Sequence, residues 1–186
     1  MKRTISQFLA VAILAGGLIL NARADVSPGE VDFGRIGEPG QGANYVEINL
    51  GRNLISLAAR LVEKQQPEAA KLLRSVQLIR VNVLGLTDGN RNDTEKRVRG
   101  VRSQLDKQKW ERIVTVQEKD GADVGVFVKA RGDEALEGVV VTVLDGKKQE
   151  AVLINIVGDI KPEQIAALGE ALNIDPLKKA GATIKK

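Results

Sequence analysis

Four strand-like runs follow one another at short intervals in the C-terminal half of the chain, at residues 112–118, 124–131, 138–145 and 151–158. Two of the connections carry the Asp-Gly pair that suits tight hairpin turns, at Asp120-Gly121 and Asp145-Gly146. Both alternating sets of residues 138–145 are apolar, which predicts a central strand covered on both faces. Hairpins in series predict an antiparallel sheet.

Two earlier strands and several helices complete the pattern. Residues 45–50 alternate like a half-buried strand, and 78–86 places Ile79, Val81 and Val83 on one face. Apolar residues at helical spacing predict helices near 54–62, 67–76 and 98–105, and another after Pro162. The first of these takes its apolar side from Leu54, Ile55, Leu57, Ala58, Leu61 and Val62. The sequence therefore predicts one α+β domain, with a mostly antiparallel sheet of four C-terminal strands plus two earlier ones, covered by about four helices.

The N-terminus has the layout of a secretory signal peptide. Basic Lys2 and Arg3 precede a largely apolar stretch over 5–20, and Ala22-Arg23-Ala24 is a small-x-small cleavage pattern. The apolar stretch is shorter than the about 20 residues that span a membrane comfortably. We therefore expect cleavage between Ala24 and Asp25 and a soluble periplasmic or extracellular product, with an uncleaved anchor as the alternative.

Export changes the charge balance. The whole chain has a formal net charge of +4, but the signal segment holds three basic residues and no acid, which leaves 25 basic against 24 acidic residues. The basic balance therefore belongs largely to the signal and does not indicate nucleic acid. After the signal peptide 1–24, the sequence predicts a Gly/Pro-rich linker or loosely attached arm over 25–43, which Phe33 and Ile36 are placed to pin. The α+β domain follows over 44–172, and a Lys-rich tail over 173–186.

Two residue types that carry much of enzyme chemistry are missing. The chain has no Cys and no His. It therefore has no disulfide, thiol nucleophile, lipid-anchored cysteine, Ser-His-Asp triad or HExxH zinc site. We expect neither a lipoprotein nor an enzyme, and we predict no cofactor and no metal.

The predicted helix near 98–105 carries the densest basic cluster. Lys96, Arg99 and Lys107 lie opposite the Val98/Val101/Leu105 stripe, and Arg97 and Arg102 flank it. A solvated amphipathic face is the ordinary interpretation. The alternative is an interaction surface for an anionic partner, formed by Lys96, Arg99, Arg102 and Lys107. Nucleic acid is disfavoured because no stacking aromatics are interleaved.

Acidic and amide residues suggest two further possibilities. Asp88-x-Asn90-x-Asn92 matches the first ligand positions of a calcium loop, but Asp93 stands where Gly is needed and Arg99 where the bidentate Glu belongs. A polar turn in which Asn92 or Asp93 caps the next helix explains the same residues. Carboxylates near the strand connections offer acid/base chemistry in principle, although no spacing selects a pair: Asp120, Asp123, Asp133, Glu134, Glu137 and Asp145.

The pattern of the chain resembles a known family. The run VEINLGRNLISLAARLVEKQQPEAAKLLRSVQLIRVNVLGL over 46–86, the lone Trp110, and GVVVTVLDGKKQEAVLINIVGDIKPEQIAAL over 138–168 resemble the bacterial domain of unknown function 4252 family. The resemblance spans about 44–172 and implies an exported envelope protein. Some members look like lipoproteins, from which this chain departs because it lacks Cys. The family brings no established catalytic residues.

These observations favour a non-enzymatic binding or interaction module of the periplasm or cell envelope. Its expected partner is an envelope protein or an anionic surface, and we expect no transmembrane segment after signal cleavage. Two alternatives stay open: a carboxylate-dependent hydrolase acting on envelope polymers, and a small-ligand carrier with an apolar pocket between helices and sheet.

Overall fold

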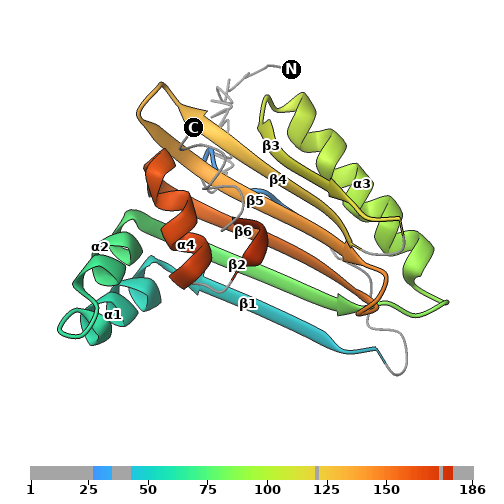
Figure 1. The fold of residues 1–186 in the computed structure, drawn as a ribbon, viewed down its shortest axis with the longest axis horizontal. Helices are drawn as coiled ribbons and strands as arrows, with labels where there is room; N and C mark the ends of the chain where they lie inside the picture. The colour runs from blue at the N-terminus through green and yellow to red at the C-terminus, as the bar shows by residue number, and fades with distance from the viewer. Residues whose placement is uncertain (1–26, 35–42, 120–121, 172–173, 178–186) are drawn as a thin grey trace, which may run out of the picture.

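The computed structural model describes residues 27–34, 43–119, 122–171 and 174–177. Its described strands form one six-stranded sheet in which every pairing is antiparallel, in the order β1-β2-β6-β5-β4-β3 (Figure 1). The α+β class predicted from the sequence is therefore confirmed. The elements are β1 (Tyr45–Gly51), α1 (Arg52–Val62), α2 (Pro67–Ser75), β2 (Val76–Gly85), α3 (Arg91–Lys107), β3 (Glu111–Gln117), β4 (Ala122–Arg131), β5 (Ala135–Asp145), β6 (Glu150–Ile160), the 3₁₀ helix η1 (Pro162–Gln164) and α4 (Ile165–Ala171).

The strand order adds what the sequence did not predict. Strands β3 to β6 form the expected series of hairpins, but β2 pairs with β6, so the two earlier strands extend the sheet beside the last one. Strand β5 is internal, as the apolar character of both its faces predicted. Between β2 and β3, the segment with α3 carries the chain from one side of the sheet to the opposite edge.

Alternation along the strands divides the core between two faces. On the α4 face, strand residues such as Val139, Val141 and Ile156 pack with residues of α1, α2 and α4. On the α3 face, Phe127, Val140 and Leu153 pack with Val98, Val101 and Leu105 of α3. The stripe predicted for the basic helix is therefore buried as expected. Figure 1 shows α1, α2 and α4 gathered toward one end of the sheet.

The segment over 27–34 is part of the core and not a loosely attached arm. Val31 and Phe33 are buried beside α3, which confirms the pinning role expected of Phe33, whereas Ile36 lies outside the described residues. Arg97 Nε donates to the Phe33 carbonyl at 2.6 Å, and Arg80 pairs with Glu30 at 2.6 Å. The sequence missed this packing because a Gly/Pro-rich segment without periodicity gives no sign of which face it will cover.

Asn155 is the buried polar residue that fixes this segment. Its Oδ1 accepts from the Val31 amide at 2.9 Å, and its Nδ2 donates to the carbonyls of Gly29 at 2.9 Å and Val139 at 3.3 Å. A Cβ added at Gly138 would lie 2.5 Å from the Gly29 carbonyl oxygen, so glycine is required where the segment crosses β5. One amide side chain thus joins three stretches of backbone in the apolar interior.

The structure tests the predicted tail in part and does not describe the predicted signal peptide. Residues 1–26, which include the predicted signal peptide and the Ala24–Asp25 cleavage site, lie outside the described residues. In the segment predicted as a tail over 173–186, Ile174 and Leu177 are buried against the α4-face core, so those two belong to the domain. Lys178 to Lys186 lie outside the described residues.

Replacing Asn155 with Leu is expected to lower the free energy of unfolding by about 2–5 kcal/mol, because the Val31 amide and the Gly29 carbonyl lose their buried partner. Urea unfolding followed by circular dichroism measures the loss. Asn92→Leu, at an exposed position on α3, is the matched control and is expected to change stability by no more than about 0.5 kcal/mol. Equal effects of the two substitutions would show that the hydrogen bonds of Asn155 to 27–34 do not stabilise the fold.

Candidate functional site

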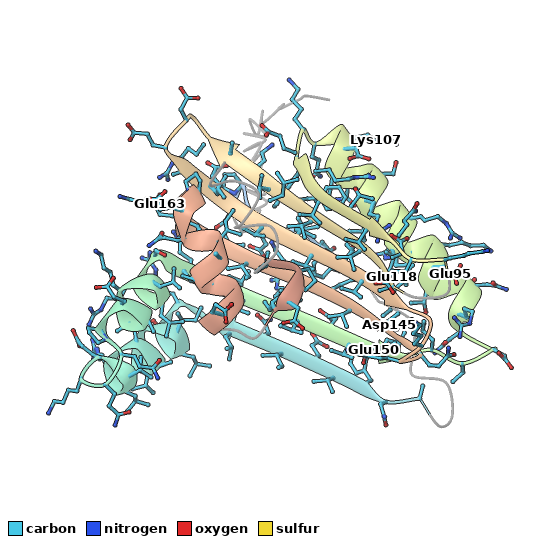
Figure 2. The ribbon with its side chains drawn as sticks, in the orientation of Figure 1. Glu95, Lys107, Glu118, Asp145, Glu150 and Glu163 are labelled. Carbon is cyan, nitrogen blue, oxygen red and sulfur yellow. The ribbon has the colours of Figure 1, made fainter. Side chains whose placement is uncertain are left out.

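The four basic residues predicted as an interaction surface do not share one environment. Lys96 and Arg99 are exposed on α3 and pair within the helix, with Asp93 at 3.8 Å and Glu95 at 3.4 Å. Lys107 is also exposed. Figure 2 shows Lys107 and Glu95 toward opposite ends of α3. Three of the four positions therefore form a solvated basic face.

Arg102 is the exception and corrects the predicted surface. Its side chain turns to the sheet, where Nη1 lies 2.8 and 2.9 Å from the two carboxylate oxygens of Asp123 and Nε lies 2.9 Å from the Thr142 hydroxyl. Only 13% of the side chain is exposed. The helical spacing placed Arg102 at the border of the buried stripe. It could not show that Asp123 on β4 and Thr142 on β5 lie within hydrogen-bond distance of this side chain.

The carboxylates singled out from the sequence serve separate local contacts. Asp123 binds Arg102, and Asp145 accepts the amides of Lys147 and Lys148 at 2.9 Å in its own turn. Asp133 and Glu134 lie beside a groove at the end of β4, where Arg131 pairs with Asp159. Asp120 lies outside the described residues, and Glu137 is partly buried on β5. Among the described members of this set, Asp133 and Glu134 line the same groove, and the contacts of the set do not select an acid and a base.

In the loop over 88–92, which the sequence offered as a possible calcium site, the Asn90 side chain bonds to backbone groups that precede the loop, at the end of β2 and just after it. The Asn90 side chain accepts the Thr87 amide at 2.8 Å and donates to the Gly85 carbonyl at 3.0 Å. Helix α3 begins at Arg91, so Asn92 and Asp93 lie inside its first turn, and neither is the N-cap residue that the sequence predicted. Asp93 still favours this end of the helix through the helix dipole.

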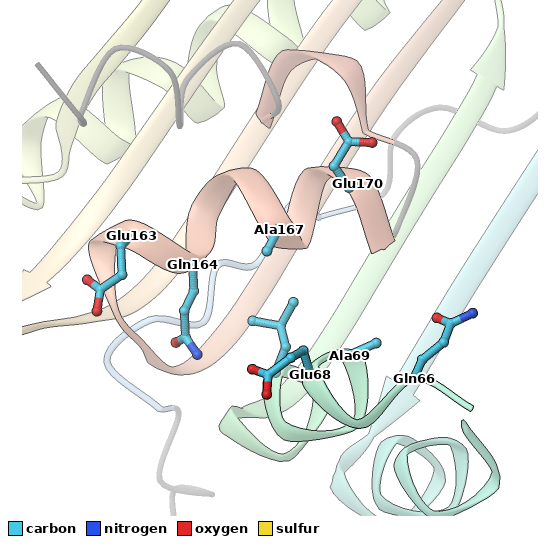
Figure 3. Close-up of a pocket in the computed structure, with 8 residues that line it drawn as sticks. Gln66, Glu68, Ala69, Glu163, Gln164, Ala167 and Glu170 are labelled. Atoms are coloured by element: carbon cyan, nitrogen blue, oxygen red, sulfur yellow. The ribbon is translucent and has the colours of Figure 1, made fainter. Parts of the chain in front are cut away.

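A groove of about 510 Å³ lies between α2 and α4 (Figure 3). Glu68, Glu163 and Glu170 line it together with apolar Ala69, Leu72 and Ala167. In Figure 3 the Glu170 carboxylate points away from those of Glu68 and Glu163. The groove is thus an acidic gap between helices in which the carboxylates do not converge on one point.

The most unusual surface of the described residues lies on β1 and α1. All of the large hydrophobic side chains that they expose belong to these two elements, which we call the β1–α1 surface: Tyr45 38%, Val46 47%, Ile48 41%, Leu54 56%, Leu57 53% and Leu61 73% exposed. Single exposed leucines are ordinary, but six large exposed hydrophobic side chains on two consecutive elements mark a candidate contact surface.

Helix α1 is apolar on two sides. Ile55 and Ala59 face the core, whereas Leu54, Leu57 and Leu61 recur at i, i+3 and i+7 on another side. The helical spacing predicted one apolar side that included Leu54, Leu57 and Leu61, but these three leucines are exposed. The available signal was the width of the apolar arc, which is more than one helix face can bury against a sheet.

The sheet beside this helix is also incompletely covered. Directly paired residues form a row of valines across all six strands on the α4 face: Val46, Val83, Val152, Val143, Val124 and Val116. The described segment 174–177 lies beside this row on β4, β5 and β6, whereas Val46 at the β1 edge is 47% exposed. Ile174 and Pro176 border a groove of about 280 Å³ on β4, β5 and β6. Figure 2 shows Glu118, Asp145 and Glu150 at this same end of the sheet.

The two edge strands are protected to different degrees. Strand β3 has an irregular register between Arg112 and Val114, and Arg112 contacts both Asp106 and the Phe127 ring. Bulges and charges of this kind keep a strand edge from pairing with another chain. Strand β1 pairs with β2 without interruption from Tyr45 to Gly51, and Glu47 is its single charged residue.

Polar groups on β1 contact each other on the α3 face. The Tyr45 hydroxyl donates to Glu47 at 2.8 Å and accepts from Asn82 at 3.3 Å. The hydrogen bond to the Glu47 carboxylate raises the pKa of the Tyr45 phenol, because ionisation would place two negative charges together. The phenol, which is protonated at neutral pH even without this shift, is therefore held as a hydrogen-bond donor to Glu47.

The fold and this surface define the class of protein: an α+β domain built on an open antiparallel sheet with helices on both faces, in which β1 is an edge strand among the described residues. The chain belongs to the family described as a domain of unknown function (DUF4252), whose family model matches residues 41–168. This confirms the resemblance identified from the sequence. No curated protein and no solved structure matches the chain. In the described residues, no helix is long and apolar enough to cross a membrane.

Arg102→Gln is expected to lower the free energy of unfolding by about 1.5–3 kcal/mol, because it leaves Asp123 without its buried cation. Arg99→Gln removes only an exposed pair within one helix and is expected to cost less than about 0.5 kcal/mol. Chemical unfolding of both variants measures the difference. If Arg102→Gln lowers the free energy of unfolding as little as Arg99→Gln does, the contact between Arg102 and Asp123 does not stabilise the fold.

Proposed function

We propose that this chain is a non-enzymatic interaction module of the cell envelope that docks a protein partner on the β1–α1 surface. The observation that carries the proposal is the coincidence of an unprotected strand edge with all the large exposed hydrophobic side chains of the described residues. A strand edge offers backbone donors and acceptors, and another extended backbone is the group that satisfies them. The partner therefore contributes a strand to β1 and apolar side chains to α1.

The location in the envelope rests on the N-terminal sequence. Lys2, Arg3, the apolar stretch over 5–20 and Ala22-Arg23-Ala24 support export. The absence of Cys and His supports a binding role over an enzymatic one, since the residue types that most often act as acid, base or nucleophile are missing. Asp123 and Asp145 are engaged in separate local contacts, which favours a structural role for these two carboxylates over the hydrolase alternative.

A photo-crosslinking residue placed at Val46 or at Leu57 is expected to give one discrete crosslinked species in cells that export the chain. The same residue at Thr115 on β3 is the edge-strand control and is expected to give none. Gel mobility and mass spectrometry of the product identify the partner. Crosslinks from Lys107 alone would move the docking site to the basic face of α3, and crosslinks from no position would overturn the proposal.

The groove beside Ile174 favours a small-ligand carrier as a second candidate. Val141, Val143, Val152 and Ile154 form its apolar floor, and Asp145, Lys148 and Glu150 stand at its polar end. Its volume of about 280 Å³ is slightly below the usual range of about 300–1,000 Å³ for ligand pockets. A short apolar molecule such as a medium-length acyl chain fits such a space.

If the groove is a carrier site, the purified chain is expected to bind decanoate in calorimetric titration. Val143→Trp fills the groove and is expected to weaken that binding by about tenfold or more. Leu57→Trp adds the same side chain outside the groove and leaves the binding unchanged. No heat of binding with the unsubstituted chain would exclude this candidate for acyl ligands.

A further inference from the structure

We propose that the partner strand on β1 is β1 of a second copy of this chain, paired antiparallel about a twofold axis at Ile48. This inference rests on the proposed function and names the partner for the same surface. A twofold axis requires a surface that is complementary to itself, with residue i against j and j against i. Strand β1, with the sequence YVEINLG, meets that requirement residue by residue.

The apolar side of the strand is symmetric about Ile48. Pairing about this residue places Ile48 opposite Ile48 of the second copy and Val46 opposite Leu50. All three residues lie on the α4 face, because they pair directly with Val81, Val83 and Ile79 of β2. Val46 and Ile48 are 47% and 41% exposed in the single chain. The pairing therefore removes apolar surface from water on both copies.

The polar side of the strand is complementary in the same register. Glu47 lies opposite Asn49 of the second copy, so that a carboxylate acceptor meets an amide donor. Tyr45 lies opposite Gly51, where a Cβ would meet nothing within 4 Å, so there is room for the aromatic ring. A ring packed over an edge glycine stabilises strand pairing.

The neighbouring registers are less favourable. An axis at Glu47 would place two carboxylates directly opposite one another, which destabilises an antiparallel pair. An axis at Asn49 would place Val46 opposite Arg52. An axis at Ile48 therefore avoids both the Glu47–Glu47 repulsion and the contact between Val46 and Arg52, and it pairs apolar residues with apolar residues.

Helix α1 extends the same interface. It begins at Arg52, directly after the glycine that lies opposite Tyr45 of the second copy. The first turn of each α1, with Leu54, then lies near the end of the partner sheet where Val46 has no described helical cover. The exposed leucines of α1 follow the C-terminal end of β1, and Val46 lies near its N-terminal end. In an antiparallel twofold pair these two ends lie side by side, so the leucines of one copy lie near Val46 of the other. The protected edge at β3 offers no such match.

A single introduced cysteine tests the register, because the chain has no other. Ile48→Cys places two thiols directly opposite one another, at the Cα separation of about 4.4–6.8 Å that a disulfide spans. Mild oxidation is expected to convert this variant to a covalent dimer. Asn49→Cys, one residue further along β1, and Thr115→Cys on the β3 edge are the controls and are expected to stay monomeric on a non-reducing gel.

Sedimentation velocity of the purified chain tests the same interface without a crosslink. The unsubstituted chain is expected to sediment as a dimer, and Asn49→Glu is expected to weaken dimerisation by about tenfold or more, because two Glu–Glu contacts replace two Glu–Asn contacts. The double variant Glu47→Lys/Asn49→Glu is expected to restore the dimer by opposite charge. Circular dichroism confirms that each variant is folded.

Two results would overturn the inference: a monomer throughout the accessible concentration range, or a dimer whose crosslinks form at Asn49→Cys or Thr115→Cys and not at Ile48→Cys. Neither result bears on the docking surface itself. In the photo-crosslinking experiment, a Val46 product that contains a different protein would keep the proposed function and reject self-pairing. Loss of every Val46 and Leu57 product would reject both.

Discussion

A sheet that is apolar on both faces has to be covered on both faces, and this constraint shapes the whole molecule. Strands β5 and β6 present valines, isoleucines and leucines in both directions. Helix α3 and the segment over 27–34 cover one face, and α1, α2 and α4 cover part of the other. Because the interior is apolar, its few polar groups are fully paired, as the three contacts of Asn155 illustrate.

The α4 face is incompletely covered near β1, and this leaves apolar side chains exposed that a protein partner can bury. The valine row that starts at Val46 crosses every strand, yet α1, α2 and α4 gather toward the other end of the sheet. At the same border, β1 is regular and nearly uncharged, whereas β3 is irregular and engaged by Arg112. Free backbone groups and exposed apolar side chains therefore coincide along one strand and one helix, and this coincidence distinguishes a docking edge from ordinary exposed residues.

Much of the fold was predictable from local patterns. Strand-like runs, turn residues and local alternation predicted the six strands, and helical spacing identified the buried stripe of α3 with Val98, Val101 and Leu105. The candidate site was less predictable. The basic cluster on α3 was visible as charge, but Arg102 proved to bind Asp123, and the leucines of α1 proved to be exposed. Sequence spacing gives a residue's angular position on its helix, and it does not give what lies opposite.

The sequence by itself determined the alternation of apolar and polar residues, the order of the helices and strands, and the self-matching order of residues around Ile48. Only the tertiary structure decided that β2 pairs with β6, that 27–34 is clamped by Asn155, and that β1 is an edge. The physical reason is that burial depends on contacts between segments far apart in the chain. Whether Leu57 or Val46 is core or surface follows from which element covers it, and that is a property of the assembled sheet.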